Sequence, residues 1–138
     1  MRRIYLDSNV FISFINKEIG RNVRGLFVEV KLFLEKVKEK EGVLVLSEWF
    51  FREAERYCYL TKDEILRYFR KNRIKTEVIE EKETLSLKGF RGRGIHYADL
   101  LHAATAIKYK CDCIVTFNVN DFEKIKDKIE IFEPLEFT

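Results

Sequence analysis

The sequence lacks the features that identify membrane and secreted proteins. No apolar run approaches the roughly 20 residues that a membrane-spanning helix needs. The first residues, Met1-Arg2-Arg3-Ile4, lead directly into a segment with the composition of a β-strand, without the apolar region of a signal peptide. We therefore expect a cytoplasmic protein that makes no contact with a membrane.

Cysteine is also scarce, and glutamine is absent. The three cysteines, Cys58, Cys111 and Cys113, are odd in number and lack a second pair at zinc-ligand spacing, which argues against a disulfide framework and a zinc finger. We expect them to be small buried apolar residues. Glutamine is missing altogether, whereas Lys, Arg, Asp and Glu make up 36% of the chain. This composition is typical of proteins from hot environments and does not bear on function.

The chain has enough apolar residues for one hydrophobic core. A hydrophobic share of 46% with 12 Phe excludes a disordered protein, and 138 residues are too few for two ordinary domains. The net charge of +3 is too small to identify a nucleic-acid partner by itself. However, one glycine-rich segment, residues 88–94, brings Lys88, Arg91 and Arg93 close in sequence to the acid Asp99.

Segments with strand composition alternate with segments of helical periodicity. Strands are expected at residues 4–6, 43–46, 77–79, 113–116 and 129–132. Between the first two, apolar residues recur at steps of three and four, at Val23, Leu26, Phe27, Val30, Leu34 and Val37. Thr61 and Glu64 have the spacing of a capping box at the start of a further helix. The alternation predicts a three-layer α/β/α sandwich around a mainly parallel sheet of about five strands.

Four carboxylates stand at the ends of apolar segments or on the apolar side of a predicted helix: Asp7, Glu53, Asp99 and Asp121. Asp7 ends the first strand, and Asp121 follows the fourth. Ligands of α/β sheets bind at the carboxyl ends of strands. Acids beside apolar faces repel one another and lose hydration unless a cation or substrate compensates. For each acid alone, a helix cap or a turn is the alternative interpretation.

Glu53 is one of three acids in the helix predicted after Ser47. At about 100° per residue, Glu53 lies on the side of the aromatic residues, whereas Glu48 and Glu55 point to the opposite side. The aromatic residues are Trp49, Phe50 and Tyr57. The alternative is that Glu53 lies at the boundary with solvent and pairs with Arg56.

Asp99 opens a predicted helix that continues through Ile107. Ala103 and Ala106 lie on its side of the helix, and small residues there let the helix approach the sheet closely. A favourable interaction with the helix dipole is the alternative role. His102 flanks the same face, and we interpret it as a packing or supporting residue in preference to a general base.

These segments resemble those of PIN-domain ribonucleases, especially the VapC-like toxins of prokaryotic toxin–antitoxin pairs. The resemblance covers nearly the whole chain and implies a single PIN-like domain over residues 1–138. It rests on four segments in the family's order: residues 5–10, 46–53, 98–106 and 115–122. It implies a metal-dependent endoribonuclease that hydrolyses RNA phosphodiester bonds.

By this resemblance, four carboxylates hold Mg²⁺ or Mn²⁺ and activate water: Asp7, Glu53, Asp99 and Asp121. Many relatives carry Asp where this chain has Asn118, so the fourth ligand is Asp121, Asn118 or both through water. The Ser8 hydroxyl is expected to orient a carboxylate or a bound water. Arg91 and Arg93 are expected to bind RNA phosphates, with a solvated connecting loop as the alternative.

The resemblance also implies a homodimer and an antitoxin protein that covers the acidic groove. Trp49, Phe50 and Tyr57 are candidates for that contact or for the core. A PIN-like RNA-binding or assembly module without catalysis is a second interpretation, favoured by Asn118 and the small net charge. A haloacid-dehalogenase-type phosphatase ranks below both, because it requires a second Asp where Asn9 stands.

Overall fold

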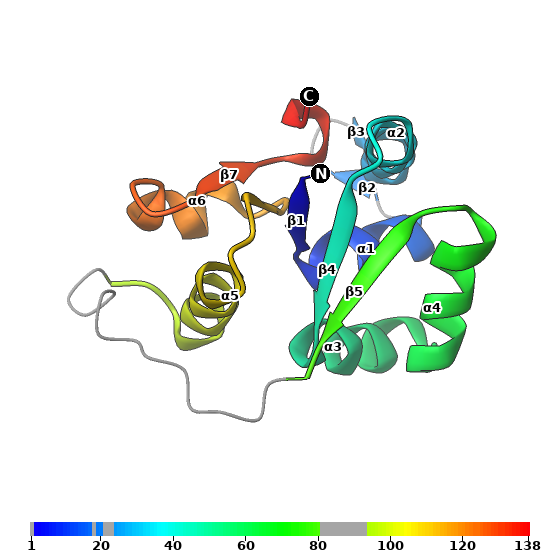
Figure 1. The fold of residues 1–138 in the computed structure, drawn as a ribbon, viewed down its shortest axis with the longest axis horizontal. Helices are drawn as coiled ribbons and strands as arrows, with labels where there is room; N and C mark the ends of the chain where they lie inside the picture. Colours follow the sequence, from blue (N-terminus) through cyan, green and yellow to red (C-terminus); the bar gives the residue numbers. More distant parts are fainter. Residues whose placement is uncertain (1, 18, 21–23, 81–93) are drawn as a thin grey trace.

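The computed structural model describes residues 2–17, 19–20, 24–80 and 94–138 (Figure 1). Its central sheet has five strands in the order β5-β4-β1-β6-β7, and every neighbouring pair is parallel. The strands are β1 (Arg3–Leu6), β4 (Val43–Ser47), β5 (Lys75–Ile79), β6 (Cys113–Val115) and β7 (Glu130–Phe132). A short antiparallel pair, β2 (Ile19–Gly20) and β3 (Arg24–Gly25), lies outside this sheet.

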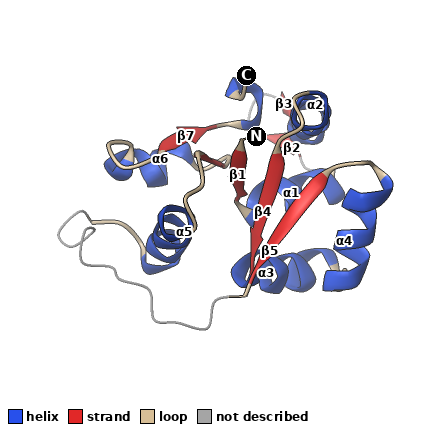
Figure 2. Cartoon of the chain, in the orientation of Figure 1, coloured by secondary structure: helices blue, strands red, loops and turns tan. Residues whose placement is uncertain are grey.

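Helices cover both faces of the sheet (Figure 2). They are α1 (Ser8–Ile15), α2 (Leu26–Glu39), α3 (Glu48–Cys58), α4 (Lys62–Lys71), α5 (Tyr97–Lys108) and α6 (Val119–Phe122), with 3-10 turns at Glu123–Ile125 and Pro134–Glu136. Side chains of α1 to α4 form one apolar cluster, and those of α5 and α6 form a second. Within β1, Ile4 and Leu6 face the first cluster and Tyr5 faces the second, as the two-residue period of a strand requires.

The predicted three-layer α/β/α architecture is therefore confirmed, and all five predicted strands are present. The main difference is at β5, which begins at Lys75 instead of Glu77 because Lys75 and Thr76 pair with Val43 and Leu44 of β4. Polar residues are tolerated there because β5 is an edge strand. No disulfide joins the cysteines, of which Cys113 is buried and the other two are partly exposed.

Helix starts follow the local sequence signals. The Ser47 hydroxyl accepts a hydrogen bond from the Phe50 amide at 3.2 Å and caps α3. At α4 the capping box is complete, because Thr61 Oγ1 accepts from the Glu64 amide and Glu64 Oε1 accepts from the Thr61 amide. The amphipathic helix predicted from Val23 onward begins at Leu26, and Val23 itself lies outside the described residues.

The topology reverses direction beside β1. From β1 the chain proceeds to β4 and β5 on one side of it, and then crosses to β6 and β7 on the other. In open parallel sheets such a switch point leaves a crevice at the carboxyl ends of the central strands. The residue that follows β1 is Asp7, and the residue that follows β6 is Thr116.

Within the described residues, the structure has no helix that is both long enough and apolar enough to cross a membrane.

The aromatic packing between α1 and α4 predicts a large stability effect for one residue. Phe69 is fully buried, and its ring centroid lies 5.4 Å from that of Phe11. We expect Phe69→Ala to lower the free energy of unfolding by about 3–5 kcal/mol, because it leaves a cavity in the larger cluster. Leu32→Ala, at a half-exposed position of α2, should change it by less than about 0.5 kcal/mol. Urea denaturation measures both, and equal effects would contradict this packing.

Candidate active site

A hollow of about 320 Å³ lies at the carboxyl ends of the central strands. Its lining includes side chains from β1's end, α1, α3, α5 and the segment after β6. Among the lining residues are Asp7, Ser8, Glu53, Asp99, His102 and Asn118. The fold thus brings together three of the four predicted carboxylates, together with the predicted Ser8 and Asn118.

Asp7 is buried and held by hydroxyl groups. Thr116 Oγ1 donates to Asp7 Oδ2 at 2.7 Å, and Ser8 Oγ donates to Asp7 Oδ1 at 3.4 Å. The Asp7 amide donates to the Val115 carbonyl at 3.0 Å, which extends the β1–β6 pairing to the edge of the hollow. Although Asp7 occupies the N-cap position of α1, its side chain caps no helix amide. The helix-cap alternative therefore does not describe this carboxylate.

Glu53 faces the hollow, as its helical position predicts. Its Oε1 lies 3.3 Å from His102 Nε2, and the hydrogen bond to His102 is the main reason why the pKa of Glu53 is below its usual range. The charge of His102 lowers it further. Glu48 instead lies 3.9 Å from Arg52 in an ion pair within α3. Glu53 pairs with His102 and not with Arg56, which lies over the Tyr57 ring.

Asp99 lies in the first turn of α5, two residues after the helix begins at Tyr97. Burial is the largest cause that raises the pKa of Asp99, and the negative charges of Asp121 and Asp7 raise it further. His102 has a raised pKa as well. Burial opposes its charged form, but the hydrogen bond to Glu53 and the charges of Asp7, Glu53 and Asp99 together outweigh that effect. The hollow is therefore an anionic environment.

The fourth predicted acid, Asp121, is not among the residues that line the hollow. Asp121 lies inside α6, is exposed, and does not line the hollow, although Asp99 experiences its charge. Its amide donates to the Asn118 carbonyl at 3.0 Å, so the two residues share one short turn. Asn118 does line the hollow. Of the two candidates for the fourth ligand, Asn118 thus lines the hollow, and Asp121 acts on Asp99 through its charge.

Two hydroxyl residues of the site were not among the predicted residues. Thr116 links the strand ends: besides its bond to Asp7, its Oγ1 accepts from the Asn118 amide at 3.0 Å and from Asn9 Nδ2 at 3.4 Å. Tyr5, which the sequence presents as an apolar strand residue, places its hydroxyl 2.5 Å from His102 Nδ1. The signal for Thr116 was a hydroxyl directly at a strand end, opposite the strand that carries Asp7.

The chemistry of these donors fits a hard divalent cation. All four predicted ligands offer oxygen atoms, which Mg²⁺ and Mn²⁺ prefer. Among residues 2–17, 19–20, 24–80 and 94–138, no three His, Cys, Asp or Glu side chains stand close enough together to hold an ion as a group.

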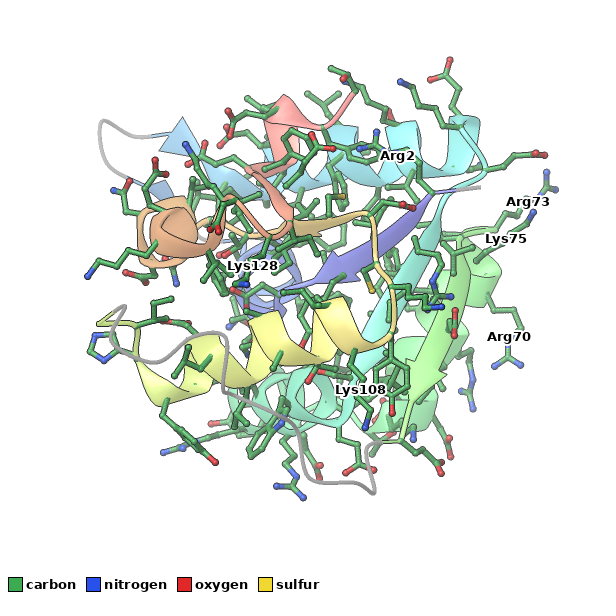
Figure 3. All side chains as sticks on the ribbon, turned by 60° about the vertical axis from the view of Figure 1, so that its left-hand side comes forward. Arg2, Arg70, Arg73, Lys75, Lys108 and Lys128 are labelled. Carbon is green, nitrogen blue, oxygen red and sulfur yellow. The ribbon has the colours of Figure 1, made fainter. Side chains whose placement is uncertain are left out.

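The predicted cationic rim lies outside the described residues, because these exclude Lys88, Arg91 and Arg93. Among the cations that Figure 3 labels, Arg70, Arg73 and Lys75 lie near the start of β5. Arg70 lies in the last turn of α4, and Arg73 follows this helix. Lys75 begins β5 at the amino end of the sheet, where it pairs with Val43. The hollow lies at the opposite, carboxyl end.

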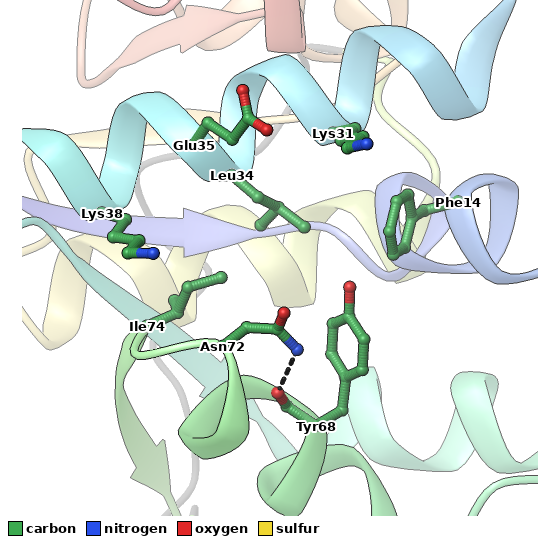
Figure 4. Close-up of a pocket in the computed structure, with 8 residues that line it drawn as sticks. All are labelled: Phe14, Lys31, Leu34, Glu35, Lys38, Tyr68, Asn72 and Ile74. Carbon is green, nitrogen blue, oxygen red and sulfur yellow. Dashed lines mark hydrogen bonds between the residues drawn. The ribbon is translucent and has the colours of Figure 1, made fainter.

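A second hollow lies between α2 and α4 and has a different character (Figure 4). Phe14, Leu34, Tyr68 and Ile74 supply apolar surface, and Glu35 is its one carboxylate. Asn72 Nδ2 donates to the Tyr68 carbonyl within the protein. The residues that line this hollow include no group of acids, unlike those of the hollow at the strand ends.

Comparison with known protein families gives one result. A family model described as PIN domain matches residues 4–128. This range spans the central sheet through β6 and includes every acid of the hollow. Proteins with this domain are generally nucleases, which are hydrolases. Among curated proteins, none matches the chain.

The electrostatics of the hollow predict that one acid destabilises the metal-free protein. The pKa of Asp99 is higher in the folded than in the unfolded chain, so its charged form costs stability at neutral pH, and this cost disappears as pH falls through the folded pKa toward the ordinary Asp value. Asp99→Asn should therefore raise the free energy of unfolding at pH 7.5 in EDTA, by no more than a few tenths of a kcal/mol, because solvent screens the charge of a partly exposed side chain.

Asp63→Asn is the matched control, because Asp63 also lies in the first turn of a helix but is exposed and outside the hollow. It should lower stability slightly through the lost dipole interaction. Thermal melts of both variants test the difference, which would be absent if Asp99 experienced no repulsion.

Proposed function

Because the chain belongs to the PIN domain family, we propose that it is a metal-dependent endoribonuclease that uses Mg²⁺ or Mn²⁺. One observation carries the proposal. Asp7, Glu53 and Asp99 come from three separate elements and line one hollow at the switch point of the sheet. The raised pKa of Asp99 reflects burial and charge repulsion, which a bound cation would relieve.

The oxygen donors of the hollow support a choice of ligands. Asp7 and Asp99 would hold the ion, with Glu53 and the Asn118–Asp121 turn acting directly or through water. When bound, such an ion polarises the phosphoryl oxygens and lowers the pKa of its water. Oxygen ligands of this kind favour hard cations over Zn²⁺, which prefers nitrogen and sulfur.

The protein's own groups prepare this chemistry. Hydroxyls of Thr116 and Ser8 fix both oxygens of Asp7, so the carboxylate keeps one orientation toward the hollow. The lowered pKa of Glu53 keeps it ionised, and an ionised carboxylate accepts a hydrogen bond from an attacking water. No residue is required as a covalent nucleophile, because water attacks the phosphorus directly.

We expect purified protein to cleave RNA in the presence of Mn²⁺. Asp7→Asn and Asp99→Asn should each lower the rate by about 100-fold or more, because metal-assisted charge stabilisation is worth several kcal/mol. Glu48→Gln is the matched control on the far side of α3, where Glu48 pairs with Arg52, and it should keep the wild-type rate. Cleavage of a mixed RNA pool measures all four proteins. Equal rates in the wild type and the Asp variants would contradict the proposal.

A module that binds RNA without cleaving it is the second candidate. Asn118, at a position where many relatives have Asp, favours it, as does the small net charge of +3. RNA binding that is tight, unaffected by EDTA and unchanged in Asp7→Asn would support this module over the enzyme.

The biological role we propose is that of a VapC-like toxin that forms a homodimer and is neutralised by an antitoxin protein. The order of the motifs supports it. Tyr57 lines the hollow and is 51% exposed, which supports it as a contact for a partner, whereas Phe50 is fully buried and belongs to the core, the alternative that the sequence also allows.

The toxin role predicts growth arrest. Expression of the wild-type chain alone should stop growth of a bacterial host, while expression of Asp99→Asn should not, because arrest requires RNA cleavage. Colony counts after induction measure the effect. Normal growth with the wild type at matched protein levels would contradict a toxin and leave the nuclease proposal to the cleavage assay.

A further inference from the structure

A chain of buried polar groups crosses the interior beside the hollow. The Tyr5 hydroxyl lies 3.0 Å from Ser47 Oγ and 2.5 Å from His102 Nδ1, and His102 Nε2 lies 3.3 Å from Glu53 Oε1. Tyr5, Ser47 and His102 are all buried. A phenylalanine in place of Tyr5 would fill nearly the same space without a polar atom to satisfy, so packing alone does not account for the hydroxyl.

The hydrogen bonds of this series can form in either protonation state of His102. Ionised Glu53 can only accept, so His102 Nε2 carries a proton. With a neutral ring, Nδ1 accepts from Tyr5, and the Ser47 hydroxyl donates to Tyr5. With a charged ring, Nδ1 donates to Tyr5, and Tyr5 donates to Ser47. In both cases the Nε2 proton is directed at Glu53.

The two ends of this hydrogen-bonded series, Ser47 and Glu53, belong to the same helix. Ser47 caps the start of α3, and Glu53 lies in the second turn of α3. Tyr5 belongs to β1, the strand that ends before Asp7, and His102 lies one turn after Asp99 on α5. The polar chain therefore connects the three elements that carry the three acids of the hollow.

We propose that Tyr5 and His102 are positioning residues that hold the Glu53 carboxylate in place relative to Asp7 and Asp99. This inference rests on the proposed function of the hollow. His102 is not the general base, because both ring nitrogens contact protein groups and the ring is 4% exposed. Burial also raises the pKa of Tyr5 above its usual range, so its hydroxyl keeps the proton that these hydrogen bonds require.

Mn²⁺ affinity, measured by calorimetry, tests this role independently of RNA. Tyr5→Phe should weaken Mn²⁺ binding about 10-fold and lower kcat with an unchanged KM for RNA, because supporting groups of metal ligands typically contribute 10–100-fold. His102→Leu should have at least the same effect. His102→Gln should recover part of the affinity, since an amide N–H can still donate to Glu53.

Tyr68→Phe is the matched control, because Tyr68 lies in the second hollow between α2 and α4 and not beside the acids. It should bind Mn²⁺ as the wild type does. Circular dichroism identifies any variant that fails to fold, and His102→Gln then serves in place of a misfolded His102→Leu. Wild-type Mn²⁺ affinity in folded Tyr5→Phe and His102→Leu would overturn the positioning role while leaving the ribonuclease proposal intact.

A metal-free measurement gives a second readout. Nitrogen-15 NMR at pH 8 should detect the Nε2-bound proton of His102 in the wild type and lose it in Tyr5→Phe, because the ring is then fixed at one end only. Persistence of the same signal in Tyr5→Phe and in Glu53→Gln would overturn the role. Weakened Mn²⁺ binding in Tyr5→Phe, together with a wild type that cleaves no RNA, would support positioning and contradict the ribonuclease.

Discussion

Repulsion between carboxylates at one end of the sheet is the constraint on which the rest of the site depends. Asp99 is partly buried within range of the charges of Asp7 and Asp121, and its pKa is raised as a result of burial and these charges. The surrounding groups reduce this cost without removing it. Thr116 donates to Asp7 and His102 donates to Glu53, so two acids are stabilised as carboxylates by neutral or cationic donors. For Asp99, the charges of His102 and His96 do not outweigh burial and repulsion, so a cation has most to contribute there.

The fold brings the carboxylates of the site close together. Parallel pairing of β4, β1 and β6 places their carboxyl ends at one edge, and the switch of strand order beside β1 opens the crevice there. Apolar burial on both faces keeps this edge rigid, since Ile4 and Leu6 pack in one cluster while Tyr5 packs in the other. The site is therefore supported by the strands that form the centre of the core.

Features determined by neighbours in sequence could be predicted from sequence. The capping box at Thr61, the apolar runs of the strands and the position of Glu53 on the inner side of α3 all depend on local periodicity or spacing. The partners of Tyr5 and Thr116 could not be predicted, because each bond joins residues about a hundred positions apart, and a hydroxyl in an apolar strand gives no sign of its acceptor. The role of Asp121 also depends on such a distant approach, and Asn118 competes for it.

Together, these acids form an anionic site whose charge a divalent cation would neutralise. The most direct measurement is the melting temperature with and without Mn²⁺ for the wild type and for Asp99→Asn. A ligand that binds only the folded state raises stability in proportion to the logarithm of its concentration over Kd. We expect a clear rise with Mn²⁺ in the wild type and a much smaller rise in Asp99→Asn. No rise in the wild type, or an equal rise in both proteins, would contradict it.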